Sequence, residues 1–68
     1  MKWEEIVGRN VRRLRLAKDW SQEDLAGAVE LDVRSIGGIE RGTQNTTVAV
    51  LGKIAIALGG HPRDLFDD

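Results

Sequence analysis

Apolar residues recur three and four positions apart along most of the chain, in short segments that end at residues typical of helix caps and turns. This spacing is that of α-helices with one buried face. It predicts an all-α fold of five short helices, at about residues 3–18, 22–29, 33–41, 47–58 and 62–66. A chain of 68 residues suffices for one domain and not for two, so we expect a single domain over residues 1–68.

Capping residues set the expected helix boundaries. Ser21 is a good N-cap, and Asp24 three residues later completes a motif like a capping box, with Asp where Glu or Gln is more usual. Gly42 is expected to end the third helix in the left-handed conformation. His61 and Pro62 read as a cap and a first-turn proline for the last short turn. Only a few residues then join the second and third helices, so these two must cross steeply.

Composition argues against several classes of function. The chain has no cysteine and His61 is its only histidine, so we expect no disulfide, no metal site and no cofactor. Its apolar stretches are far shorter than the ~20 residues that a membrane helix needs. We find no nucleophile paired with a base and no phosphate-cradling glycine loop, so we do not expect an enzyme. A soluble, cytoplasmic protein is expected.

Charge is unevenly distributed. The net charge of −1 argues mildly against nucleic acid, because DNA-binding domains usually carry a basic excess. Five basic residues nevertheless fall in one stretch without an acid: Arg9, Arg12, Arg13, Arg15 and Lys18. By itself this stretch is equally compatible with a solvated helix face and with a DNA-facing surface.

Three segments together resemble the helix-turn-helix family of the lambdoid-phage repressors and Cro, also called Xre-type. They are SQEDLA at 21–26, SIGGIERG at 35–42 and LGKIAIALG at 51–59. The family pattern is S-Q-x-x-L-A, then S-x-x-x-x-E-x-G, then L-x-x-I-A-x-A-L. The resemblance runs from about Ile6 to Phe66. It implies a small transcriptional regulator, with a repressor as the expected kind, that places residues 33–41 in the major groove of double-stranded DNA.

The resemblance also implies roles for individual residues. Base-reading positions would be Val33, Arg34, Ser35 and Gly38. Contacts to the DNA backbone would come from Gln22, Arg41, Thr43, Gln44 and Asn45, and we add Arg9, Arg13 and Lys18 as a basic flank. Arg15 and Glu40 match a structural ion pair of the family. Arg34 is the sharpest candidate, because its planar fork can pair with O6 and N7 of guanine.

Two departures from the family pattern bear on DNA affinity. Gly37 and Gly38 lie inside the expected recognition helix, where each costs about 1 kcal/mol relative to alanine. Relatives often have a long polar residue at the position of Gly38, so either close approach of the backbone is required or base recognition is poor. Glu30 replaces a left-handed turn glycine at a cost of about 1–2 kcal/mol. A protein-interaction module, or an antitoxin with weak DNA binding, therefore stays open as an alternative.

The expected fourth helix carries apolar residues outside its inward stripe. Ala49, Ile56 and Ala57 form a second strip, which Lys53 interrupts. One helix-turn-helix unit covers few base pairs, and relatives pair two units so that their recognition helices enter successive major grooves about 34 Å apart. We therefore predict a homodimer interface made of Ala49, Lys53, Ile56, Ala57, Gly60 and Phe66.

Overall fold

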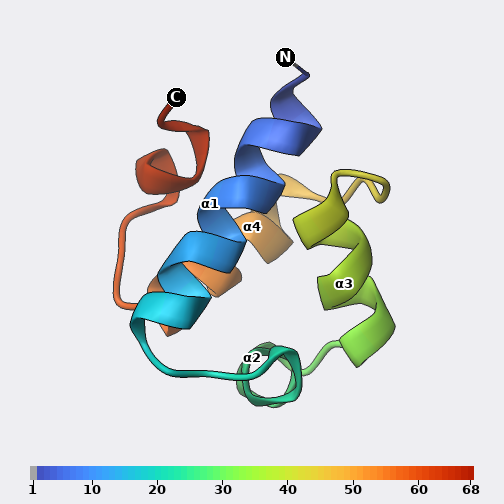
Figure 1. Cartoon of the computed structure of the whole chain (residues 1–68), viewed down its shortest axis with the longest axis vertical. Coiled ribbons are helices and arrows are strands. Elements are labelled where there is room, and N and C mark those ends of the chain that lie inside the picture. Colours follow the sequence, from blue (N-terminus) through green and yellow to red (C-terminus); the bar gives the residue numbers. More distant parts are fainter. Residues whose placement is uncertain (1) are drawn as a thin grey trace.

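Residues 2–68 are described by the computed structural model, in which they form four α-helices followed by a short 3₁₀ helix (Figure 1). The elements are α1 (Trp3–Ala17), α2 (Gln22–Val29), α3 (Val33–Arg41), α4 (Val48–Ala57) and η1 (Pro62–Phe66). The all-α class is confirmed. Two details of the predicted helices are corrected: Lys18 and Leu58 are C-caps, and the last helix is 3₁₀ and not α. Thr47 is the N-cap of α4.

The helix starts follow the capping chemistry expected from the sequence. The backbone N–H of Asp24 donates to Oγ of Ser21 over 3.0 Å, and the backbone N–H of Ser21 donates to Oδ2 of Asp24 over 2.8 Å. This is a reciprocal capping box, which satisfies two backbone donors that the helix itself leaves unpaired. At the next boundary Asp32 caps α3 by accepting from the backbone N–H of Arg34 at 2.8 Å.

Left-handed residues make the sharp turns. Glu30 has φ 59° and ψ 43° between α2 and α3, where the family usually has glycine. Gly42 has φ 74° and ends α3, as predicted. Asp19 also has a positive φ of 59° after α1, which no sequence pattern had indicated. The Glu30 turn is what lets α3 leave α2 at a steep angle, so its strain is part of the helix-turn-helix geometry.

One apolar core joins all five elements. Each element contributes at least one side chain that is 0% exposed, among them Val11, Leu25, Ile36, Ile54 and Leu65, from α1, α2, α3, α4 and η1 in that order. Burial of such side chains stabilises a small domain by about 1.5–3 kcal/mol each. Because α3 is tied to this core through its inner face, its opposite face is free for another molecule. No helix within residues 2–68 has the length and apolar character needed to cross a membrane.

The backbones of α1 and α3 touch at a glycine. A β-carbon built on Gly8 would lie 2.6 Å from the carbonyl oxygen of Glu40 and still closer to that of Ile39. Both are backbone atoms, which cannot move aside as a flexible side chain would. Only glycine allows this approach, and it fixes the distance of α3 from α1.

Candidate nucleic-acid interface

The first turn of α3 projects from the molecule. The side chain of Arg34 is 91% exposed, and Val33 is 36% exposed. Ser35 is half-buried at the same turn, while Ile36 turns into the core. The turn therefore presents a cation, an apolar group and a hydroxyl outward from a rigid helix, which are group types suited to reading base edges in a major groove.

Asp32 and Arg34 interact at the tip of this turn. The backbone hydrogen bond from Arg34, with its guanidinium nearby, lowers the pKa of the Asp32 carboxyl below its ordinary value. Nη2 of Arg34 lies 3.6 Å from Oδ2 of Asp32, and both side chains are largely exposed to water. A pair of this kind is weak. The guanidinium can therefore leave Asp32 for a stronger partner without disturbing the helix cap, which uses the other carboxylate oxygen.

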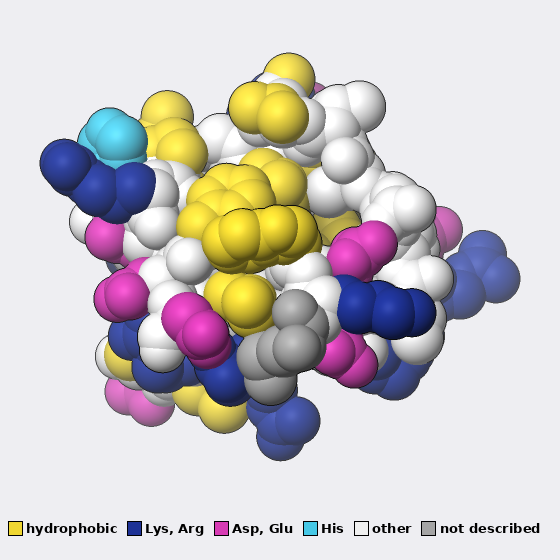
Figure 2. Space-filling view, turned by 90° about the horizontal axis from the view of Figure 1, so that it is seen from above, with side chains coloured by type: hydrophobic (Ala, Val, Ile, Leu, Met, Phe, Trp, Pro, Cys, Tyr) yellow, Lys and Arg dark blue, Asp and Glu magenta, His cyan; other side chains and the backbone are white. Residues whose placement is uncertain are grey.

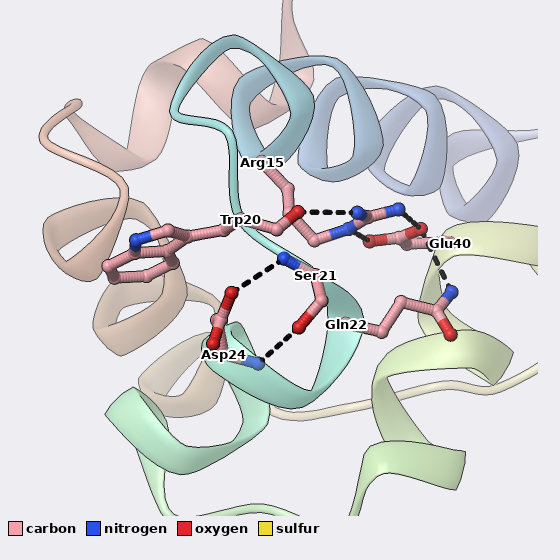
Figure 3. A network of polar contacts seen from close by, with 6 residues as sticks. All are labelled: Arg15, Trp20, Ser21, Gln22, Asp24 and Glu40. Carbon is pink, nitrogen blue, oxygen red and sulfur yellow. Dashed lines mark hydrogen bonds and ion pairs between the residues drawn. The ribbon is translucent and has the colours of Figure 1, made fainter.

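A buried polar network holds α3 against α1 and α2 (Figure 3). Nε and Nη2 of Arg15 donate to the two carboxylate oxygens of Glu40 over 2.6 and 3.0 Å. Nη1 of Arg15 donates to the carbonyl oxygen of Trp20 at 2.8 Å. The paired side chains are only 9% and 4% exposed. These hydrogen bonds to Glu40 raise the pKa of Arg15, although burial opposes the shift.

Gln22 belongs to the same network. Its amide Nε2 donates to Oε1 of Glu40 over 3.2 Å, and the residue is half-buried at the start of α2 (Figure 3). The side chain therefore braces α3 against the start of α2. Its contact to the DNA backbone stays a prediction.

The loop after α3 folds back over the end of that helix. The backbone N–H of Thr43 donates to the carbonyl oxygen of Gly38 over 3.0 Å, and its hydroxyl donates to the same atom over 3.3 Å. Arg41, Gln44 and Asn45 are exposed beside it. Gly38 is buried, with the Gln44 side chain across it, and its part in base reading stays a prediction.

The predicted basic flank has other partners in this structure. Nη2 of Arg9 donates to Asp68 at 3.2 Å, and Nη2 of Arg13 donates to Asn10 at 3.3 Å. Nζ of Lys18 lies 4.8 Å from the centre of the Trp20 ring, a cation–π contact. The first two contacts lie on the side of α1 that faces the C-terminal segment. This flank is therefore a weaker candidate for contact with the DNA backbone than the loop after α3.

The residues predicted for a dimer interface divide between two surfaces. Ala49, Lys53 and Ile56 are exposed on α4, with Ile56 at 72%. Ala57 is partly buried against the core and lines one surface hollow together with Lys53 and Ile56, and Gly60 is half-buried after α4.

Phe66 lies on the second surface. It is 41% exposed and packs edge-to-face on Trp3, with ring centres 6.0 Å apart. Together they border a shallow apolar pocket of about 120 Å³ that Leu51 also lines. Figure 2 looks onto the end of the molecule that holds the N-terminus, and apolar side chains gather there.

Asn10 is a structural residue that the sequence analysis missed. It is 3% exposed, and its amide donates to the carbonyl oxygens of Leu65 and Asp67 over 2.9 and 2.8 Å. The only hint in the sequence is a polar residue beside the apolar stripe of the first helix. Its amide ties the C-terminal segment to α1.

The sequence matches the helix-turn-helix family HTH_3 over residues 11–65. The control protein C.BamHI of Bacillus amyloliquefaciens is 44% identical over 63 residues, which are 91% of this chain and 78% of that protein. The crystal structure of the restriction-modification controller protein C.AhdI from Aeromonas hydrophila superposes with a TM-score of 0.88 at 43% identity, over 93% of this chain and 96% of the other. The hypothetical transcription factor NHTF from Neisseria superposes with a TM-score of 0.93 at 32% identity, over 97% of this chain and 76% of that chain.

Proposed function

Because the chain belongs to the helix-turn-helix family, we propose that it is a sequence-specific, DNA-binding regulator of transcription that inserts the first turn of α3 into a major groove. One observation supports this most directly: Arg34 stands 91% exposed at the start of a helix whose other end is held by the Arg15–Glu40 pair. A reading side chain on a rigid support can keep its hydrogen-bond geometry, as base discrimination requires.

Arg34 carries the largest share of the proposed base readout. Its guanidinium can donate two hydrogen bonds to O6 and N7 of guanine, the commonest specific contact in the major groove. In this proposal Val33 presses on a thymine methyl group, and Ser35 donates to or accepts from a base edge. Discrimination from a good bidentate pair is worth about 1–3 kcal/mol.

Contacts to the DNA backbone would come from both sides of α3. Gln22 lies at the N-terminus of α2, where free backbone N–H groups and the helix dipole favour a phosphate. Arg41, the last residue of α3, and the loop residues Thr43 and Asn45 line the opposite side. Such contacts fix the register of the protein on the duplex but carry little sequence information. They also make affinity fall steeply with salt.

The role of Arg34 is tested by Arg34→Ala on the preferred duplex and on single-base variants of it. We expect a loss of about 1–3 kcal/mol and a relaxed preference at one base pair. Arg63→Ala is the matched control, because Arg63 is an exposed arginine on η1 and away from α3. An equal loss on every sequence would show that Arg34 contacts a phosphate, and would refute base reading.

We also propose that the protein acts as a homodimer on a two-fold DNA site. The exposed Ile56, flanked by Lys53 and Ala49 on α4, is an apolar group without cover in the single chain. Phe66, the other large apolar residue of the predicted interface, is exposed on a separate surface beside Trp3. A dimer, with two copies of α3, would read twice as many base pairs as a single chain.

Genes of a restriction–modification system are the proposed target class. C.AhdI is named as a controller of such a system, and it shares 43% of residues with this chain. For a relative of bacterial proteins the DNA lies in the cytoplasm, where we place this activity. A reporter driven by the promoter of neighbouring restriction or modification genes should respond to the chain and fail to respond to the Arg34→Ala variant. A reporter with equal output in all cases would exclude this target class.

A further inference from the structure

A side chain from the loop fills an empty position on the reading face of α3. Arg34 and Gly38 are four residues apart, so they share one face of the helix and lie about 6 Å apart along its axis. A β-carbon built on Gly38 would lie 2.7 Å from Oε1 of Gln44 and 2.9 Å from its Cβ. The space that any side chain at position 38 would need is therefore occupied by Gln44.

The backbone holds Gln44 in this place. Gly42, in the left-handed conformation, turns the chain back at the end of α3. Thr43 is then bound to the carbonyl oxygen of Gly38 by both its N–H and its hydroxyl. Gln44 itself is exposed, and within residues 2–68 its amide makes no hydrogen bond. Its donor and acceptor groups are thus available to a ligand, and the bonded backbone of Thr43 keeps the Cβ of Gln44 beside Gly38.

The neighbouring glycine is covered in the same way. A β-carbon on Gly37 would lie 3.0 Å from Nη1 of Arg41. Gly37 and Gly38 therefore form a shallow recess on α3, which the side chains of Arg41 and Gln44 cover. The need for this space is a physical reason for glycine at both positions, although each glycine destabilises the helix by about 1 kcal/mol relative to alanine.

We propose that Gln44 is a specificity-determining residue, which reads a base in place of the side chain that Gly38 lacks. The proposal rests on the function proposed above, since it requires α3 in the major groove. A glutamine amide can donate to N7 of adenine and accept from its N6 amino group. A separation of about 6 Å corresponds to about two base steps of 3.4 Å. The expected half-site thus has a guanine read by Arg34 and an adenine about two base pairs away.

Duplex selection from a random library, followed by binding to single-base variants of the selected site, tests this. The proteins are the wild type, Gln44→Ala, Gly38→Ala and the double variant. Gly52→Ala is the matched control, because it adds the same methyl group to a helix where nothing lies within 4 Å. Circular dichroism of each protein shows that it is folded.

Gln44→Ala should lower the preference at one base pair by about 5- to 100-fold and leave the other positions unchanged. Gly38→Ala should displace Gln44 and lower the preference at the same base pair, with no further loss in the double variant. Gln44→Glu should move the preference there from adenine to cytosine, since a carboxylate accepts from the cytosine amino group. Gly52→Ala should read DNA as the wild type does.

Three results would overturn the inference, and they are distinguishable. Equal weakening of all duplexes by Gln44→Ala would make Gln44 a phosphate contact. If Gln44→Ala loses the base preference but Gly38→Ala keeps it, the recess at Gly38 does not position the Gln44 amide. Failure of the wild type to select any site would overturn the proposed function and this inference with it.

Discussion

Breaking the buried pair between Arg15 and Glu40 should remove a large part of the stability of the domain. The Glu40 carboxylate accepts three hydrogen bonds, of 2.6, 3.0 and 3.2 Å, from Arg15 and Gln22. Glu40→Gln would leave the Arg15 guanidinium without its counter-charge at 9% exposure. Removing one member of a buried pair costs about 3–5 kcal/mol, and the slight exposure here favours about 3. A domain of 68 residues is stable by only about 3–10 kcal/mol, so this loss is a large fraction of the total.

A double-mutant cycle measures the interaction itself. Arg15→Met keeps much of the apolar stem and removes the charge, so the double variant leaves neither partner unpaired. We expect a coupling free energy of about 2 kcal/mol from urea unfolding followed by circular dichroism. The matched control is the exposed pair of Arg9 and Asp68, at 48% and 74% side-chain exposure, whose coupling should stay below about 1 kcal/mol. A coupling for Arg15 and Glu40 under about 0.5 kcal/mol would refute the role given to the network.

Further predictions concern packing, pH and assembly. Gly8→Ala should destabilise the fold by about 1–3 kcal/mol or more. Gly27→Ala, with open space around it, should stabilise the fold by about 0.5–1 kcal/mol. Equal effects of the two substitutions on urea unfolding would contradict the close contact of α1 and α3. The pKa of Asp32 is lower in the folded protein than its unfolded value of about 4. The ionised carboxylate therefore stabilises the fold above about pH 4, and this stabilisation is lost as the pH falls through the lower pKa of the folded protein. Unfolding midpoints between pH 5 and pH 3 should therefore fall less in Asp32→Asn than in the wild type, and parallel curves would exclude this contribution. Ile56→Glu should abolish dimers in sedimentation and leave a folded monomer, while a variant that still dimerises would rule out the α4 interface.

The helices could be predicted because their signals are local. The spacing of apolar residues marked each helix, and caps such as Ser21 and Gly42 marked their ends to within about one residue. The errors at Lys18 and Leu58 arise because a cap residue shares the composition of the helix it ends. The 3₁₀ form of η1 could not be predicted from one turn of sequence.

The site was less predictable because its contacts join distant segments. The Arg15–Glu40 pair spans 25 positions, and only the family resemblance suggested it. Nothing in the residue types showed that Gly8 would meet the backbone of α3. The same holds for Gln44, since its place over Gly38 depends on the path of the loop and not on any periodic pattern.

Selection of bound duplexes from a random library, read by sequencing, tests the central claim of sequence-specific DNA binding most directly. The account predicts an enriched motif in two inverted half-sites about one helical turn apart, with a guanine in each half-site whose preference is lost in Arg34→Ala. Binding to this motif should weaken steeply with salt, as phosphate contacts require. A bound pool with no motif beyond the starting library would contradict the account, and would favour a protein partner for this fold.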